Sequence, residues 1–213
     1  MTGRGRIGYD FAKRAFDVAS ATVALVVTSP IQLGVAIAVA TKLGRPVLFR
    51  QARPGKDGRI FTLVKFRTMA NADKSTADVS QDAVRLSRFG SILRSTSLDE
   101  LPTLVNVIRG DMSIVGPRPL LVQYLDRYTP AQARRHEVRP GVTGLAQVKG
   151  RNALGWERKF ELDVDYVDNR SFVLDAKILY WTIAAVLKRD GIVAADHATT
   201  HEFRGTADES GGK

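Results

Sequence analysis

The stretch Val23–Gly44 reads VALVVTSPIQLGVAIAVATKLG, and it decides where the rest of the chain can lie. It belongs to a longer run, from Val18 to Thr41, that contains no charged residue. A straight helix over that run would be ~36 Å long at ~1.5 Å per residue, enough to span a hydrocarbon core of ~30 Å. Pro30 interrupts it, because proline lacks an N–H and clashes with the preceding helical turn. The run is therefore a single membrane span, a signal peptide, or a broken helix that enters the membrane and returns.

The residues on either side of the run favour the third alternative. Lysine and arginine cluster on both flanks, with Arg4, Arg6, Lys13 and Arg14 before the run and Lys42, Arg45, Arg50, Arg53 and Lys56 after it. Such clusters favour the cytoplasmic side, and a single crossing would satisfy only one flank. A signal peptide has a shorter apolar region and lacks strongly basic residues after it. We therefore predict a re-entrant helix that turns at Ser29 and Pro30, with arms too short to cross alone.

Asp17 lies at the start of the apolar run. Lys13 and Arg14 precede it by four and three residues, so both can reach it on one helix face. We interpret Asp17 as a paired charge at the membrane interface rather than as a catalytic group.

Length, composition and charge limit the function classes. The 213 residues suffice for one domain plus an appendage, and the absence of cysteine excludes disulfides and cysteine-ligated zinc. A net charge of +10 suggests an anionic partner, which is nucleic acid, anionic lipid or a phosphorylated substrate. The glycines match neither the P-loop nor the dinucleotide-binding pattern.

The part of the chain after the apolar run has mixed secondary structure. β-rich runs at Val47–Gln51 and Ile60–Phe66, separated by turn residues, predict a hairpin. Val84–Arg94 has helical character, and Leu145–Val148 is interpreted as a short strand. The apolar segment Ile178–Leu187 is too short to span a bilayer, so it is either an interfacial helix or a core helix.

The segment Arg94–Leu120 reads RSTSLDELPTLVNVIRGDMSIVGPRPL and contains a predicted helix that ends at Gly110. Its buried face is predicted from the apolar spacing of Leu101, Leu104, Val105 and Ile108. Two starts are open: Ser97 and Glu100 form a capping box, or Asp99 is the N-cap. Either start places Asp99 and Glu100 at a helix N-terminus.

That carboxylate pair has a structural and a chemical interpretation. Acidic residues are favoured at a helix N-terminus by the helix dipole, and Glu100 could simply cap. However, Arg94 precedes the pair, and Arg118 lies in the Gly/Pro loop VGPRPL, whose rigid backbone suits holding an anion. Carboxylates close to several arginines suggest a metal-assisted phosphate site.

Several motifs in a fixed order resemble those of the bacterial sugar transferases. These motifs are KRAFD, the Ser-Pro apolar segment, KFRTM, RSTSLDELPTLVNVIRGDMSIVGPRP, RPGVTGLAQVKGRN and ELDVDYV. The chain looks like a small monotopic phosphoglycosyl transferase, an enzyme that starts glycan assembly on a lipid carrier, and the resemblance runs from about Tyr9 to the tail. One departure is Asp165, which stands where an aromatic residue is common.

The resemblance implies a two-step reaction. Asp99 attacks the β-phosphate of a UDP-sugar, UMP leaves, and undecaprenyl phosphate then takes the phosphosugar from the aspartate. It also implies a Mg²⁺ cofactor, with Asp99 and Glu100 as candidate ligands. Lys65, Arg94, Arg118 and Arg151 match basic positions and are candidates for phosphate or nucleotide contacts. Asp163 matches an active-site position in the same set and would orient a basic group.

Taken together, we expect a mainly helical α+β protein. It would contain the re-entrant helix-break-helix, a small β-hairpin and amphipathic interfacial helices. Its parts would be the membrane hairpin (1–44), a catalytic domain (45–196) and a weakly ordered tail (197–213). We expect it at the bacterial inner membrane, with the catalytic domain on the cytoplasmic face. The partners would be a UDP-sugar of unspecified kind, undecaprenyl phosphate and membrane lipid, with a homodimer left open and no nucleic acid. The rival interpretations are a non-catalytic membrane scaffold and a basic nucleic-acid-binding protein.

Overall fold

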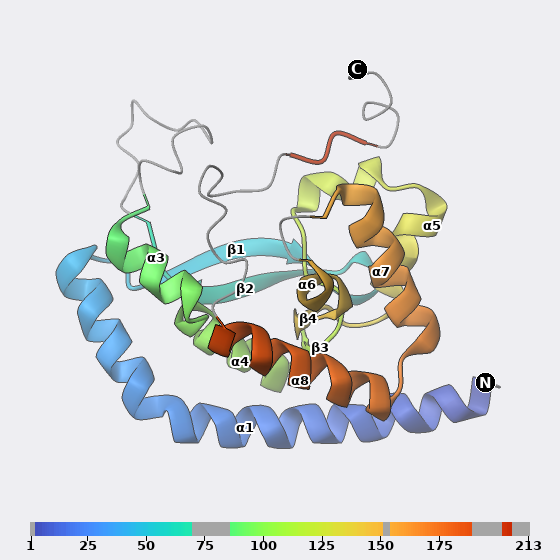
Figure 1. Ribbon diagram of the computed structural model, residues 1–213, viewed down its shortest axis with the longest axis horizontal. Coiled ribbons are helices and arrows are strands. Elements are labelled where there is room, and N and C mark those ends of the chain that lie inside the picture. The colour runs from blue at the N-terminus through green and yellow to red at the C-terminus, as the bar shows by residue number, and fades with distance from the viewer. Residues whose placement is uncertain (1–2, 70–85, 151–153, 189–201, 206–213) are drawn as a thin grey trace.

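The computed structural model describes residues 3–69, 86–150, 154–188 and 202–205. Helices dominate it, and its strands form two small sheets of two strands each. The expected mainly helical α+β class is therefore confirmed (Figure 1). In chain order the elements are α1 (Gly3–Lys42), β1 (Leu48–Pro54), η1 (Lys56–Gly58), β2 (Ile60–Phe66), α3 (Arg88–Ser95), η3 (Leu98–Thr103), α4 (Leu104–Arg109), β3 (Ser113–Val115), η4 (Val122–Arg127), α5 (Pro130–Ala133), η5 (Arg134–Glu137), β4 (Gly141–Thr143), α6 (Leu145–Lys149), α7 (Trp156–Asn169) and α8 (Phe172–Lys188).

Helix α1 is long and visibly bent, and Pro30 lies within it (Figure 1). The hydroxyls before the proline bond to carbonyls of the preceding turn, Thr28 to Ala24 O at 2.6 Å and Ser29 to Val26 O at 2.7 Å. Such side-chain bonds bend helices and make a break tolerable in lipid. By length and composition, the part from Gly8 to Lys42 could cross a membrane, and only 6% of its most apolar window is buried. The rest of the protein therefore leaves this most apolar part of the helix largely uncovered.

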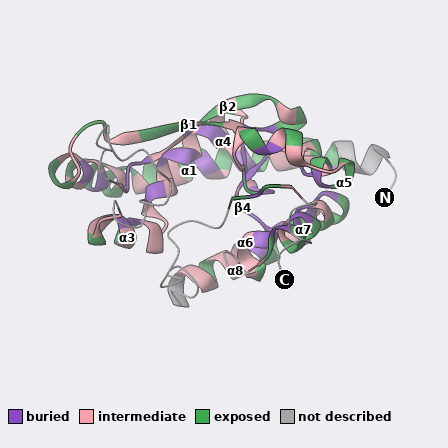
Figure 2. Cartoon of the chain, turned by 90° about the horizontal axis from the view of Figure 1, so that it is seen from above, coloured by how far each residue is buried: buried purple, intermediate pink, exposed green. Residues whose placement is uncertain are grey.

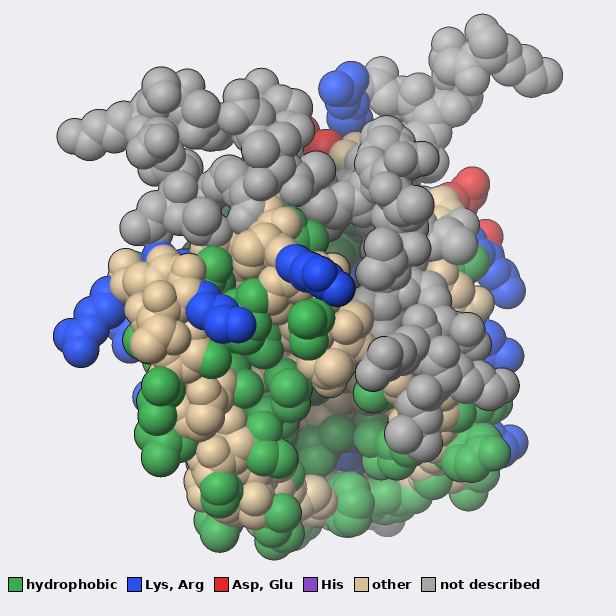
Figure 3. All heavy atoms as spheres, turned by 60° about the vertical axis from the view of Figure 1, so that its left-hand side comes forward, with side chains coloured by type: hydrophobic (Ala, Val, Ile, Leu, Met, Phe, Trp, Pro, Cys, Tyr) green, Lys and Arg blue, Asp and Glu red, His purple; other side chains and the backbone are tan. Residues whose placement is uncertain are grey.

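Exposed apolar side chains gather on one side of the molecule. In Figure 3 they cover much of the lower part of the surface, the side on which the first arm of α1 runs in Figure 1. Helix α8 has one buried and one exposed face, because Ile178 is fully buried whereas Tyr180 is 70% exposed. One face of α8 is therefore part of the core, and the interfacial position suggested for Ile178–Leu187 stays a prediction for the exposed face. Other large apolar side chains that are exposed on the described helices are Phe11, Phe16, Val23, Val26, Val27, Ile31, Leu33, Ile37, Ile92, Phe172, Val173 and Ile183.

The predicted hairpin is confirmed. Strands β1 and β2 pair antiparallel, from Leu48 opposite Phe66 to Pro54 opposite Ile60. Its inner face packs on α4 and α1 through the buried side chains of Leu63, Val107 and Ala21. Figure 2 shows buried residues on α4 and on the adjoining side of α1, with exposed residues on the outer faces of the elements. The hairpin is thus held rigidly against the helix that follows Asp99 and Glu100.

The strand predicted at Leu145–Val148 is wrong, because these residues form helix α6. Leu145 and Ala146 are buried on one face of that helix, against α7 and α8. The strand of this region is β4, just before it, which pairs parallel with β3. This pairing brings two backbones so close that a Cβ on Gly141 would lie 2.1 Å from the Gly116 nitrogen. Glycine is therefore required at position 141, where β4 begins beside the end of β3.

The C-terminal residues 202–205 are docked, which corrects the expectation of a weakly ordered tail for this part of it. Phe203 is 1% exposed and packs edge-on against Phe160 and Tyr124. Arg127 donates to the Phe203 carbonyl and pairs with Glu202 at 2.9 Å. A four-residue segment is too short to show periodicity, so this docked segment could not be predicted from the sequence.

Candidate active site

The segment around Asp99 is a 3₁₀ helix, η3, that continues into α4. Ser97 precedes it in the left-handed conformation (φ 56°) and makes no side-chain cap. The predicted capping box is therefore wrong, and Asp99 is not the N-cap, since it lies inside η3. The predicted stop at Gly110 is confirmed, because Gly110 caps α4 with φ 98°.

Glu100 turns toward two basic side chains instead of capping. Its Oε1 atom accepts from Lys65 Nζ at 2.5 Å and from Arg118 Nη2 at 3.2 Å. Burial alone would raise the pKa of this carboxyl, but Lys65 and Arg118 outweigh burial and lower it to about 2. Burial lowers the pKa of Lys65, and the carboxylate of Glu100 partly offsets that effect. Glu100 is thus a permanently charged anchor between strand β2 and the loop that carries Arg118.

Asp99 lies next to Glu100, but its carboxylate has different surroundings. It is 8% exposed, and no hydrogen bond or ion pair of its carboxylate is seen in the described part of the chain. Burial, and then the neighbouring charge of Glu100, raise its pKa to about 6, against the opposing pull of Lys65, Arg118 and Arg94. A buried carboxylate that no bond restrains is suited to react rather than to support structure.

The position of Lys65 is fixed by side chains from η3 and α4. Thr103 donates to Val64 O at 3.0 Å, and Asn106 accepts from Val64 N at 3.1 Å and donates to Thr62 O at 2.8 Å. Asn106 is fully buried, so these bonds lock strand β2 onto α4. Asn106 was missed in the sequence, where a polar residue in an apolar helix gave only a weak signal.

The predicted buried face of this helix is shifted. The buried residues are Pro102, Thr103, Asn106 and Val107, whereas Leu101, Leu104, Val105 and Ile108 are only partly buried. Leu104 and Ile108 still pack against the core. The chain is 3₁₀ before it is α, and polar side chains bond to β2, so the most buried positions differ from the apolar spacing.

The loop that carries Arg118 is held from behind by a buried ion pair. Arg135 donates to Asp163 Oδ2 at 2.7 and 3.0 Å, and the same Arg135 donates to the Arg118 carbonyl at 2.7 Å. Asp163 therefore acts on the carboxylate pair only indirectly, because it orients Arg135, which holds the Arg118 loop. Arg135 was also missed, because nothing in the sequence distinguishes it from the other basic residues around it.

The remaining predicted basic residues are placed as follows. Arg94 donates from Nε to Thr68 Oγ1 at 3.1 Å, and its charge acts on Asp99. Arg151 lies outside the described residues. The structure thus brings Lys65, Arg94 and Arg118 around Asp99 and Glu100.

The carboxylates of Asp99 and Glu100 fit a Mg²⁺ site that is completed by ligands from the substrate, rather than one formed by protein side chains alone. Among the described residues, no group of three or more His, Cys, Asp or Glu side chains could hold a metal ion. Mg²⁺ is commonly bound by one or two carboxylates together with substrate phosphates and water. Asp99 and Glu100 provide this kind of donor set.

Comparison with known proteins places the chain in a family. A family model described as bacterial sugar transferase matches residues 8–189. The uncharacterized sugar transferase EpsL of Bacillus subtilis is 53% identical over 198 residues, which are 93% of this chain and 98% of that protein. A UDP-glucose:undecaprenyl-phosphate glucose-1-phosphate transferase of Caulobacter vibrioides is 40% identical, over 87% of this chain and 73% of its own length. A UDP-N-acetylgalactosamine-undecaprenyl-phosphate N-acetylgalactosaminephosphotransferase of Aeromonas hydrophila is 39% identical, over 84% of this chain and 44% of its own.

Proposed function

The chain belongs to the bacterial sugar transferase family, and from this premise we propose that it moves a sugar 1-phosphate from a UDP-sugar to undecaprenyl phosphate. Family membership makes it a transferase, so the interpretation as a non-catalytic scaffold is wrong. The observation that carries the proposal is the buried, unrestrained Asp99 carboxylate beside the charged trio of Glu100, Lys65 and Arg118.

Asp99 is the nucleophile in this proposal. Its carboxylate oxygen attacks the β-phosphorus of the UDP-sugar, the bond from that phosphorus to the bridging oxygen breaks, and UMP leaves with the electron pair. A phosphate oxygen of undecaprenyl phosphate then attacks the phosphosugar on Asp99, which releases the free carboxylate. With a pKa of about 6, Asp99 is mostly ionised at pH 7 and able to attack.

The surrounding charges serve the phosphates. Arg118 and Lys65 would stabilise negative charge that develops at the phosphorus, and Glu100 holds both side chains in place. Asp99 and Glu100 would hold Mg²⁺ together with diphosphate oxygens, and the bound ion would offset the charge that opposes attack by a carboxylate.

We further propose that α1 is re-entrant and that the catalytic part lies on the cytoplasmic face. Both arms of the helix contact the same body. In the first arm, Arg14 donates to Val107 O at 2.6 Å, and in the second arm Val39 is fully buried against Phe66. A helix with both ends on one body does not place that body on two sides of a membrane, and the basic flanks favour the cytoplasmic side.

The test of the nucleophile uses a UDP-sugar labelled in the β-phosphate, without acceptor. Wild-type protein should retain the label, and peptide mapping should place it on Asp99. Asp99→Asn preserves shape but lacks a nucleophilic carboxylate, so its UMP release should fall to background. Glu100→Gln is the neighbouring control and should still trap label, although more slowly. A folded Asp99→Asn variant with near-normal turnover would defeat the assignment.

The sugar is identified by the same readout. UMP release should be screened over UDP-sugars with undecaprenyl phosphate present, beginning with UDP-glucose and UDP-N-acetylgalactosamine, for which the relatives are named. Release without any acceptor-dependent stimulation would argue against transfer to the lipid.

A further inference from the structure

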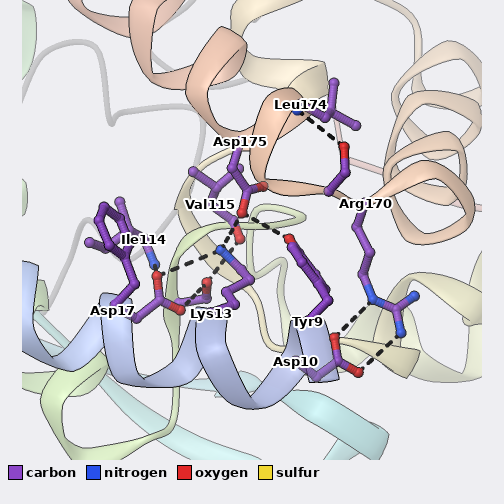
Figure 4. Close-up of polar contacts among 12 residues, drawn as sticks. Tyr9, Asp10, Lys13, Asp17, Ile114, Val115, Arg170, Leu174 and Asp175 are labelled. Carbon is purple, nitrogen blue, oxygen red and sulfur yellow. Dashed lines mark hydrogen bonds and ion pairs between the residues drawn. The ribbon is translucent and has the colours of Figure 1, made fainter. Parts of the chain in front are cut away.

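A buried polar network joins the first arm of α1 to α7, α8 and β3 (Figure 4). Its centre is Asp175 on α8, whose Oδ2 accepts from the Tyr9 hydroxyl and from Lys13 Nζ, both at 2.8 Å. The Tyr166 hydroxyl lies 2.8 Å from Asp175 Oδ1 and 3.0 Å from Val115 O. The network thus ends on the last residue of strand β3.

Asp17 extends the network along the same strand. Lys13 Nζ lies 3.6 Å from Asp17 Oδ1, so this predicted ion pair is confirmed. The predicted pairing with Arg14 is wrong, because Arg14 donates instead to carbonyls at the end of α4. Asp17 also accepts from the Ser113 hydroxyl at 2.7 Å and from Ile114 N at 3.3 Å. Every residue of β3 is therefore bonded to the network.

The charges of this network oppose any shift between α1 and β3. Asp17 is 2% exposed and Asp175 is 7% exposed, and the two carboxylates share the single ammonium of Lys13. Hydroxyl and backbone N–H donors satisfy the remaining oxygens. Breaking one contact of such a network leaves a buried charge without compensation, which is costly.

Strand β3 leads directly into the loop of the active site. Val115 is followed by Gly116, whose nitrogen donates to Thr143 O at 2.9 Å, and then by Pro117 and Arg118. Arg135 fixes the Arg118 carbonyl from the other side. The network therefore determines where the loop starts, and Arg135 determines where its backbone goes next.

We propose that Asp17 of the apolar helix α1, supported by Lys13 and Asp175, is a positioning residue. It holds Arg118 where its guanidinium contacts a phosphate. Through Ser113 and Ile114 it fixes β3 relative to α1, and thereby holds the guanidinium of Arg118 in place beside Glu100. This inference rests on the proposed function, in which Arg118 contacts a phosphate. It makes the position of the apolar helix part of the geometry of the active site.

A double-mutant cycle between Asp17 and Arg118 tests this role. The full chain is assayed in vesicles for kcat/KM of UMP release from a UDP-sugar. Arg118→Ala should lose on the order of 100-fold, as expected for one donor to a transition-state charge. Asp17→Asn should lose on the order of 10-fold, less than the ~100-fold that a misplacement of ~1 Å can cost, because Arg135 still holds the Arg118 carbonyl. If Asp17 acts through Arg118, the double variant should lose no more than Arg118→Ala alone.

The matched control is Asp10→Asn. Asp10 is on the same helix and pairs with Arg170 at 3.1 Å, but no bond from it to β3 exists among the described residues. Its variant should keep activity within about twofold, a small loss compared with that of Asp17→Asn. If Asp17→Asn does not fold, Ser113→Ala, which removes one hydroxyl, replaces it in the cycle.

The outcomes separate the inference from the proposed function. Inactive wild-type protein would defeat the proposed function itself. An active wild type in which the losses from Asp17→Asn and Arg118→Ala multiply, to about 1,000-fold together, would overturn the positioning role alone. Equal losses from Asp10→Asn and Asp17→Asn would overturn it as well, because the effect would then belong to α1 docking in general.

Discussion

Asp99 and Glu100 are adjacent in sequence, yet their surroundings move their pKa values in opposite directions. Burial and the charge of Glu100 raise the pKa of Asp99 to about 6. The pKa of Glu100 falls to about 2 despite burial, because Lys65 and Arg118 contact its carboxylate directly. Environments that separate two such values commonly assign different roles to the two groups. Glu100 is accordingly held by two basic side chains, and Asp99 has the raised pKa that our proposal assigns to the reacting carboxylate.

This separation predicts that the ionised Asp99 carboxylate lowers the stability of the folded protein. Because the folded-state pKa of Asp99 is raised from 3.8 to about 6, the folded protein binds the proton more tightly than the unfolded chain between these values. Stability is therefore lost as pH rises through that window, and at ~1.4 kcal/mol per pKa unit the full cost is about 3 kcal/mol above pH ~6. Asp99→Asn should raise the free energy of unfolding by up to this amount at pH 7.5 and by almost nothing below pH ~4, as measured by denaturant unfolding.

The control for that measurement is Asp57→Asn. Asp57 is exposed in the turn of the hairpin and has φ 55°, which asparagine tolerates. Its variant should show no comparable gain. A destabilised Asp99→Asn at pH 7.5 would mean that the carboxylate is structurally required after all.

At the scale of elements, the sequence predicted the helix end and the hairpin, which depend on neighbouring residues only. The hairpin and the stop at Gly110 depend on turn chemistry and on a left-handed glycine, which the sequence displays directly. The capping box failed because Glu100 found stronger partners in Lys65 and Arg118, which are distant in sequence. The strand at Leu145–Val148 failed because four apolar residues fit either a strand or a buried helix.

The candidate site was predictable only in part for the same reason. Five of the seven predicted residues, Lys65, Arg94, Asp99, Glu100 and Arg118, gather in one place, and the motifs pointed to them. Arg135 and Asn106 act by contacts with residues far along the chain, Asp163 and Val64, so no local pattern revealed them. Their roles follow only from the tertiary fold.

The docked segment 202–205 gives a prediction at this scale. Phe203 is 1% exposed among the rings of Tyr124, Tyr128, Trp156 and Phe160. Phe203→Ala should lower the free energy of unfolding by about 3 kcal/mol, the lower part of the range for buried phenylalanine, because a short segment can relax. Thermal unfolding measures this change. Arg204→Ala, an exposed neighbour, should have little effect, and equal shifts for both variants would show that the docking is unimportant.

At the scale of the whole molecule, both arms of the bent helix α1 contact the rest of the protein. Its first arm is bonded to α4, β3 and α8, and the end of its second arm is capped by Arg67, which donates to Gly44 O at 2.5 Å. Its outward side chains remain apolar and uncovered. A membrane is the environment in which this combination is stable, since the uncovered side chains would otherwise face water.

The re-entrant arrangement that we propose predicts the side on which each end of α1 lies. The chain has no cysteine, so single cysteines at Gly5 and Lys56 report on the two flanks without background. A membrane-impermeant maleimide should label both sites only when it has access to the cytoplasmic face, because both arms return to the same body. Pro30→Ala restores the helical N–H and removes the clash, so part of the protein should straighten and move one flank to the opposite face. Ile31→Ala keeps the proline and should leave the labelling unchanged. Labelling of the two wild-type flanks from opposite faces would establish a spanning helix instead, and the contacts of both arms with one body would then have to break in the membrane.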